Sequence, residues 1–229
     1  MAFASSSTTT TRNATLLIVS TSSAPTPESS DLSIPPAKRI LGAAKSLFAT
    51  KGYELTTTAM IARQAGTSES QIIKYYENKE GVLVAVFNEA WSRITQQLEP
   101  LRSIVLGADR LEAMVGVMLN FFRADPALQE LMLFEGRRLR REGDLLLTSG
   151  YLSFVRIVDE ALREMHSAGQ LRPELNVEAT RSALIGMFEG MLRDQTLAAR
   201  SSYPAQYSLE AMHVIFRTAM QAFVVRATQ

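Results

Sequence analysis

Apolar residues recur at intervals of three and four between residues 37 and 51, which is the spacing of an amphipathic helix. Pro35 and Pro36 stand where such a helix can begin, because its first turn has no backbone donors to lose. Gly52 follows the last turn as a typical stop. The pattern therefore predicts a first helix that ends near residue 51. Its apolar positions are Ile40, Leu41, Ala44, Leu47 and Phe48.

Two short helices separated by a tight turn at Gly66 are predicted next. Thr57 is a suitable N-cap for the first of them, because its hydroxyl can accept from a free backbone N–H. Ser68 and Gln71 have the S-x-x-Q spacing of a capping box and open the second helix. The inward residues of the first short helix are Ile61, Ala62 and Ala65. A helix, a glycine turn and another helix result.

The second short helix is predicted to carry polar side chains on its exposed face. Ile72 and Tyr76 are four residues apart, so they share one face, which we expect to point into the core. Two further pairs have the same spacing on the polar side, and they are Ser70 with Lys74 and Gln71 with Tyr75.

From Asn78 onward the pattern stays helical. Asn78 caps a fourth helix that runs to about Leu98, where Pro100 stops it. Five further helices follow from about residue 108, with breaks at residues 125–126, 143–144, 169–173 and 203–204. No segment alternates with the period of two that a strand needs. We therefore expect an all-α fold of about nine helices.

Charge is concentrated in one short segment. The 229 residues carry a formal net charge of +1, but residues 35–80 hold seven lysines and arginines against four glutamates. A helix-turn-helix places its second helix in the major groove of DNA, so the exposed face of that helix should be polar and flanked by cations. Residues 67–75 meet this requirement. The alternative is an ordinary helical hairpin on a bundle surface, and the local charge favours the DNA-binding interpretation.

Composition excludes several classes of chemistry. There is no cysteine, so disulfides, thiolate catalysis and cysteine zinc sites are excluded, and a cytoplasmic location fits best. An enzyme would have to draw acid and base groups from His166, His213, Glu135 and Glu189, which form no catalytic pattern. We expect no enzyme activity, cofactor or metal. No apolar run approaches the length of a membrane span, so no membrane partner is expected.

Residues 1–33 are expected to be a disordered extension. Fifteen of the first thirty residues are serine or threonine, a composition that cannot bury enough apolar surface to fold. The apolar stretch from Leu16 to Val19 is too short for a signal peptide. A mistaken start codon and a DNA-grasping arm with the single cation Arg12 are the alternatives.

About forty-five contiguous residues carry a spaced motif. It consists of Arg39-Ile40-Leu41, Ala43-Ala44, Leu47-Phe48, Gly52-Tyr53, Thr57, Ile61-Ala62, Ala65-Gly66, Ser68, Tyr75-Tyr76 and Asn78-Lys79-Glu80. The motif resembles the N-terminal DNA-binding domain of the tetracycline-repressor (TetR) family of bacterial transcriptional regulators. Residues 168–175 and 186–190 are similar to the sensor domain of that family. The resemblance implies a helix-turn-helix domain at residues 34–81 and a ligand-sensing and dimerisation domain at residues 82–229.

The resemblance also implies which residues meet DNA. Phosphate contacts fall on Thr57, Thr58, Thr67, Ser68 and Lys79, and the helix in the groove would use Ser70, Gln71, Ile73, Lys74 and Tyr75. Gln71 is the candidate base reader because its amide matches adenine, although it can instead cap Ser68. Ile73 stands where the family often has a tyrosine. Glu69 is expected to stabilise the helix start, unless it accepts from a cytosine amine.

The C-terminal half supplies the candidate effector and dimer residues. Methionines and aromatic residues suit an adaptable apolar cavity, and the candidates are Trp91, Met118, Phe122, Phe134, Tyr151, Phe154 and Met187. The last two long helices carry apolar stripes, from which we expect a four-helix homodimer seam. Its residues are Leu184, Phe188, Met191, Met212, Phe216, Met220 and Phe223, and core packing within one chain is the alternative.

The expected function is a homodimeric, ligand-responsive regulator, a repressor that binds a palindromic double-stranded DNA operator. A small, largely apolar effector would release it from the operator by shifting the spacing of its two reading helices. A third possibility keeps the sensor and assigns the helix-turn-helix to a protein partner.

Overall fold

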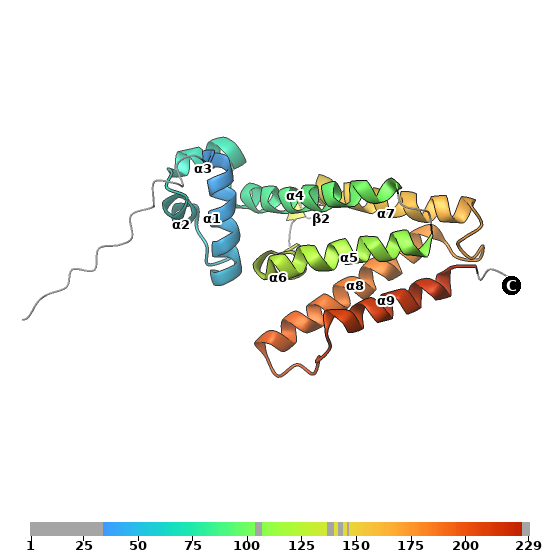
Figure 1. The fold of residues 1–229 in the computed structure, drawn as a ribbon. Helices are drawn as coiled ribbons and strands as arrows, with labels where there is room; N and C mark the ends of the chain where they lie inside the picture. The colour runs from blue at the N-terminus through green and yellow to red at the C-terminus, as the bar shows by residue number, and fades with distance from the viewer. Residues whose placement is uncertain (1–33, 104–106, 137–139, 142–143, 146, 226–229) are drawn as a thin grey trace, which may run out of the picture.

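The computed structural model describes residues 34–103, 107–136, 140–141, 144–145 and 147–225. The first three helices form a block at one end of the molecule (Figure 1). They are α1 (Pro36–Lys51), α2 (Thr58–Gln64) and α3 (Glu69–Tyr76). The long helix α4 (Lys79–Leu98) runs from this block into a bundle of helices. The predicted extension at residues 1–33 lies outside the described residues.

The bundle holds five more α-helices among the described residues. They are α5 (Ala108–Ala124), α6 (Pro126–Phe134), α7 (Ser149–Ser167), α8 (Val177–Arg200) and α9 (Leu209–Phe223). After α4 the chain continues through Pro100 as a 3₁₀ helix, η2 (Glu99–Ser103), so the proline ends the α-helix but not the helical turn. The predicted all-α fold with about nine helices is confirmed. In the described part of the chain, no helix is long and apolar enough to cross a membrane.

One short ladder departs from the expectation that no strand would form. Strands β1 (Arg140–Arg141) and β2 (Asp144–Leu145) pair antiparallel between α6 and α7. A ladder of two residues is too short to show an alternating pattern in sequence. It lies in the arginine-rich run that follows α6, a helix that already stops at Phe134. Residues 137–139 of this run lie outside the described residues.

The predicted helix starts are confirmed by their capping bonds. Thr57 Oγ1 accepts from the Met60 backbone N–H (3.2 Å), and Asn78 Oδ1 accepts from the Gly81 N–H (2.8 Å). Gly52 and Gly66 have φ values of 84° and 59°, a left-handed conformation that glycine adopts at little cost. These two turns set the angles between α1, α2 and α3.

One continuous apolar core extends from the three-helix block into the bundle. Ile72 anchors α3 in it with no exposed surface, and α4 contributes Val82 and Phe87 near its start and Leu98 at its end. Helix α1 also packs against α6, where the Lys45 ammonium pairs with Asp125. Asp125 is the N-cap of α6. The three-helix block is therefore joined to the bundle through both α4 and α6.

The predicted dimer residues mostly face the interior of their own chain. Five of the seven are buried in the single chain: Leu184, Phe188, Met212, Phe216 and Met220. The other two, Met191 and Phe223, are partly buried and pack against the same core. Phe188 lies between the rings of Phe122 and Phe216, with centroids 6.0 and 5.8 Å away. These residues therefore pack within their own chain, which was the alternative to a dimer seam. Side chains that are already buried in one chain have no surface left for a second chain to contact.

Candidate nucleic-acid interface and effector cavity

The outward side of residues 67–75, called the α3 edge below, is open to solvent. Ile73 is 54% exposed and Tyr75 is 43% exposed, whereas Ile72 is fully buried on the opposite side of the helix. Ser70 and Lys74 are also exposed, and Gln71 is half-buried. Helices α2 and α3 lie at the end of the molecule away from α8 and α9 (Figure 1). Within residues 34–225, as far as the structure describes them, the α3 edge is therefore left open for a partner.

Serine hydroxyls organise the start of α3. Ser68 Oγ accepts from the Gln71 backbone N–H (3.4 Å) and lies 2.8 Å from Ser70 Oγ. Among the described residues, the reciprocal bond from the Gln71 side chain to the Ser68 N–H is absent. The capping box is half formed, so the Gln71 amide is available for another partner.

Thr58 and Glu69 join the starts of α2 and α3. The Thr58 hydroxyl donates to the Glu69 carboxylate, with 2.7 Å between Oγ1 and Oε2. Glu69 is exposed and is the first residue of α3. Because a hydroxyl carries a single hydrogen, Thr58 cannot donate to a phosphate while it makes this bond. If Thr58 contacts a phosphate as predicted, the donor would be its backbone N–H at the start of α2 and not its hydroxyl.

Arg39 holds the turn between α2 and α3, a role that the sequence pattern did not reveal. Its guanidinium donates to three backbone carbonyls, those of Ala65 (3.0 Å), Gly66 (3.2 Å) and Ile34 (3.2 Å). Two of these carbonyls belong to the glycine turn itself. Arg39 is one of the cations of the positive segment, but its donors are used to fix the turn.

Lys79, a predicted phosphate contact, is anchored at the start of α4. Its ammonium donates to the Tyr53 carbonyl (2.9 Å) and lies 4.2 Å from the centre of the Tyr53 ring. The Glu54 carbonyl lies 3.4 Å away. Two of its three hydrogens have protein partners, so a phosphate would find one remaining donor.

Two tyrosines of the block have altered acidity. Burial raises the pKa of Tyr76, and the charge of Glu89 raises it further. The Tyr76 hydroxyl donates to the Ala37 carbonyl (2.9 Å), which ties α3 to the start of α1. Burial likewise raises the pKa of Tyr53, with Glu80 as the next cause. Both phenols remain neutral donors at physiological pH.

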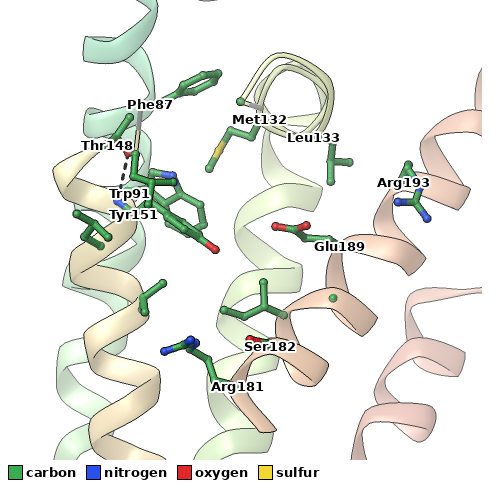
Figure 2. Close-up of a pocket in the computed structure, with 16 residues that line it drawn as sticks. Phe87, Trp91, Met132, Leu133, Thr148, Tyr151, Arg181, Ser182, Glu189 and Arg193 are labelled. Carbon is green, nitrogen blue, oxygen red and sulfur yellow. Dashed lines mark hydrogen bonds between the residues drawn. The ribbon is translucent and has the colours of Figure 1, made fainter. Parts of the chain in front are cut away.

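A cavity of about 800 Å³ opens among α4, α6, α7 and α8. Its walls combine apolar and aromatic side chains with a few polar groups (Figure 2). The Tyr151 hydroxyl and the Glu189 carboxylate point toward each other across the space. The polar groups on the walls are those of Thr148, Tyr151, Arg181, Ser182, Glu189 and Arg193.

A second, narrower cavity of about 100 Å³ lies deeper in the bundle. It shares Trp91, Met132, Leu133, Ile185 and Glu189 with the larger cavity. Almost all of its other walls are apolar, and they include Met114, Met118, Phe122, Phe154, Leu184, Phe188, Phe216 and Met220. The larger cavity is thus apolar with a few polar groups, and the deeper cavity beside it is apolar apart from Glu189.

Five of the seven predicted effector residues line these cavities. Trp91 borders both, Tyr151 borders the larger, and Met118, Phe122 and Phe154 border the deeper one. Phe134 and Met187 border neither. Phe134 is the last residue of α6 and is 36% exposed. The periodicity of an apolar helix does not indicate which of its apolar residues face a void.

Apart from Tyr151, the polar residues of the larger cavity were not among the predicted effector residues. The Arg181 guanidinium pairs with both oxygens of the buried Asp159, at 2.9 and 2.8 Å, and Arg163 lies 3.5 Å from Asp159. An arginine held in this way keeps its position and retains further donors for a ligand. The i,i+4 spacing of Asp159 and Arg163 is the only sequence signal for this cluster. Within the described ranges, no three acidic or histidine side chains are grouped to hold a metal.

The junction of α4 and α7 borders the larger cavity. Asn88 Oδ1 accepts from the Gly150 N–H (3.0 Å) and from the Ser149 hydroxyl (3.2 Å) at the start of α7. A side chain on Gly150 would place its Cβ only 2.7 Å from Trp91 Cβ. Trp91 stacks on Phe154, with ring centroids 4.8 Å apart. The helix that leaves the three-helix block thus forms one wall of the cavity.

Comparisons with known proteins agree with this arrangement. Residues 40–86 match the family model of bacterial regulatory proteins, tetR family. The fatty acid metabolism regulator protein of Bacillus subtilis is 23% identical over 179 residues, which cover 78% of this chain and 90% of that protein. The transcriptional regulator UidR of Escherichia coli is 22% identical, covering 74% of this chain and 87% of that protein.

Solved structures share the fold. The regulator FadR from Bacillus subtilis in complex with stearoyl-CoA has a TM-score of 0.72 at 21% identity, covering 80% of this chain and 96% of that one. FadR from Bacillus halodurans has a TM-score of 0.70 at 21% identity, covering 82% and 95%. These relatives are transcription regulators and not enzymes. Residues 40–86 therefore match the helix-turn-helix of the tetR family of bacterial regulatory proteins, and the chain shares its fold with the FadR regulators.

Proposed function

We propose that this regulator is a homodimeric repressor that binds a palindromic operator and is released by a largely apolar effector. The open α3 edge carries the proposal, because it is held rigidly by the buried Ile72 and by the Arg39 bonds to the turn. A reading helix has to be polar, exposed and fixed in orientation to contact base edges. The operator contacts would come from the α3 edge together with Thr57 and Lys79.

The outward faces of α8 and α9 are suited to form the dimer. Val214 and Ile215 on α9 are 42% and 52% exposed, and exposed apolar side chains of this size on one helix favour an interface. Ala183 on α8 is small and exposed, so a neighbouring helix can approach closely there. A two-fold pairing there would present two α3 edges about 34–36 Å apart, in successive major grooves.

The two domains divide the work in this proposal. Residues 34–81 bind DNA, residues 82–229 sense the effector and form the dimer, and the protein acts in the cytoplasm. An effector that enters between Trp91 and Tyr151 would displace α4, which begins immediately after the α3 edge. The pair of Lys45 with Asp125 offers a second connection from α6 to α1. A coupling of about 1–3 kcal/mol between the two sites is typical of such regulators.

The shape of the cavities indicates the class of effector. The deeper cavity has room for the end of an apolar chain, and the larger one has room for the rest of the chain and for a polar group beside Tyr151, Arg181 and Ser182. The Bacillus subtilis FadR structure contains stearoyl-CoA, which combines an apolar chain with a polar group. We infer an amphipathic effector with the end of its apolar chain in the deeper cavity.

DNA binding is tested with Gln71→Ala and Lys79→Ala. An operator is first selected from random duplexes with the wild type. The affinity of each variant for this operator and for unselected DNA is then measured at several salt concentrations. We expect Gln71→Ala to lower the ratio of operator affinity to random-DNA affinity by about 5- to 150-fold, the range of one bidentate base contact. Lys79→Ala should weaken binding to both DNAs by a similar factor and make the affinity less dependent on salt. A wild-type protein with no preference for any sequence would overturn the DNA-binding proposal.

Effector binding is tested by the fluorescence of Trp91, the only tryptophan in the chain. Dodecanoic acid should change its emission and release operator DNA, whereas acetic acid should not. Met118→Trp fills the deeper cavity and should abolish the release by dodecanoic acid. Val225→Trp is the control, because Val225 is exposed after the end of α9 and lines neither cavity. Equal release from the two variants would contradict the assigned cavity.

A further inference from the structure

We propose that Glu69 reads a base, as an acceptor for a cytosine amine, and that Thr58 positions it. The proposal rests on the DNA-binding function proposed above and extends it to a residue that is not among the expected DNA contacts. An acidic side chain on a DNA-facing helix needs an explanation, because it is repelled by the phosphates. Glu69 lies at the first position of α3 and is exposed.

The position of Glu69 places it among base edges and not beside the backbone. In a helix-turn-helix, residues near the N-terminus of the second helix contact the bases. Glu69 and Ile73 are four residues apart, so they lie on the same face of α3. Ile73 is 54% exposed and is suited to contact a thymine methyl group. The same strip of α3 therefore presents an acceptor followed by an apolar group.

The bond from Thr58 fixes the Glu69 carboxylate. Thr58 Oγ1 donates to Glu69 Oε2 over 2.7 Å, and this bond spans from α2 to α3. A carboxylate has two oxygens with about four acceptor positions, so it can accept from another donor while it holds Thr58. A free glutamate would swing between phosphates and solvent. One that is held in place is positioned before DNA arrives, which lowers the entropy cost of a specific contact.

The chemistry of the major groove selects the base. A carboxylate accepts only, and the groove offers donors on the exocyclic amines of cytosine and adenine. The adenine amine is flanked by the acceptors N7 of adenine and O4 of thymine, which repel a carboxylate. The cytosine amine has an acceptor on one side only. Glu69 is therefore expected to specify cytosine at one position of each half-site.

The test compares operator preferences of the full-length dimer. Binding sites are selected from random duplex DNA with the wild type, Glu69→Gln and Glu77→Gln. Glu77→Gln is the matched control, because it removes the same charge at the other end of α3. We expect Glu69→Gln to lose about 5- to 150-fold of cytosine preference at one half-site position, with the other positions unchanged. Glu77→Gln should keep every preference.

Thr58→Val and Thr58→Ser test the positioning role. Valine removes the donor and serine restores it, so Thr58→Val should weaken the same cytosine preference and Thr58→Ser should recover it. If Thr58→Val weakens operator and random DNA equally, its hydroxyl grips a phosphate and the positioning role fails.

Two outcomes separate this inference from the function it rests on. A wild type that selects a defined palindrome, with Glu69→Gln showing the same preferences, overturns the role of Glu69 alone. That role also fails if Glu69→Gln raises the affinity for all DNA uniformly, because Glu69 then acts only by repulsion. A wild type that selects no sequence overturns DNA binding itself.

Discussion

At the scale of single residues, several polar side chains of the DNA-binding block are bound to its own backbone. Arg39 donates to the carbonyls of Ile34, Ala65 and Gly66, and Lys79 donates to those of Tyr53 and Glu54. Their charges are formally part of the positive segment, but their donors are largely used within the fold. The local excess of cations in a sequence therefore overstates the number of free phosphate contacts.

Arg39→Met tests whether the turn depends on these bonds. The variant keeps most of the aliphatic stem and loses its three bonds to backbone carbonyls. We expect the free energy of unfolding to fall by about 1–3 kcal/mol, because bonds from charged donors are among the stronger ones and these are partly exposed. Chemical denaturation measures the change. Arg63→Met on exposed α2 is the control and should change stability by less than about 0.5 kcal/mol. Equal losses would contradict the role of Arg39.

The raised pKa values of Tyr53 and Tyr76 predict a loss of stability in alkali. Because burial raises these pKa values in the folded state, the stabilisation is present below the ordinary tyrosine pKa of about 10. It is lost as pH rises through the folded-state values. Denaturation midpoints measured between pH 8 and about 11.5 should fall above about pH 10. Tyr76→Phe removes one of the two titrating phenols, so the denaturation midpoint of this variant should fall less steeply with pH than that of the wild type. An identical slope would contradict the assignment.

At the scale of helices, α4 belongs to two structures at once. Its first turns complete the core around α3, and its later turns carry Trp91 into the wall of the cavity. Asn88 and Gly150 bring α4 and α7 into close contact next to this wall. A displacement of α7 at the cavity is therefore expected to move α4, which begins directly after α3 at the end of the DNA-binding block.

Gly150→Ala tests how tightly the two helices are packed. The added Cβ would lie 2.7 Å from Trp91 Cβ and 3.3 Å from the Asn88 carbonyl oxygen, so α4 and α7 must separate. We expect stability to fall by about 1–3 kcal/mol, the usual cost of overpacking, and Trp91 emission to shift. Gly42→Ala is the control, because Gly42 is exposed on α1 and a Cβ there meets no atom within 4 Å; it should be neutral or stabilising by up to about 1 kcal/mol. An unchanged Gly150→Ala protein would show that the junction is loose.

At the scale of the whole molecule, the spacing of two α3 edges in the proposed dimer would depend on how the two chains pair. Leu184, Phe188, Met212, Phe216 and Met220 are buried in their own chain, so the pairing surface proposed above is the outward face of α8 and α9. That face carries Val214 and Ile215 on α9 and the small residue Ala183 on α8. In the proposed dimer, this one surface would set both the dimer geometry and the operator spacing.

Ile215→Asp tests the proposed pairing surface. A carboxylate in the centre of an apolar interface loses its hydration, so we expect the variant to sediment as a monomer and to lose operator affinity. Leu55→Asp is the matched control, because Leu55 is 75% exposed and lies in the loop between α1 and α2. It should remain a dimer. A dimeric Ile215→Asp protein would place the interface elsewhere.

The helices and their caps could be predicted because the forces that form them are local. The spacing of Ile40 and Phe48, the hydroxyls of Thr57 and Ser68 and the glycine at position 66 act within a few residues of each other. These features determined the helix-turn-helix and therefore the family resemblance. The open side of α3 followed from the same pattern.

Only the tertiary structure decided which side chains meet across the chain. Arg39 binds a turn 26 residues away, and Asp159 holds Arg181 in the cavity wall from another helix. Phe188 and Met220 fill their own core and leave the opposite faces of α8 and α9 free. The periodicity of a helix shows that it has an apolar side but not what covers that side. The cover, the cavity and the positions of buried charges depend on how neighbouring helices pack, and packing is a property of the whole chain.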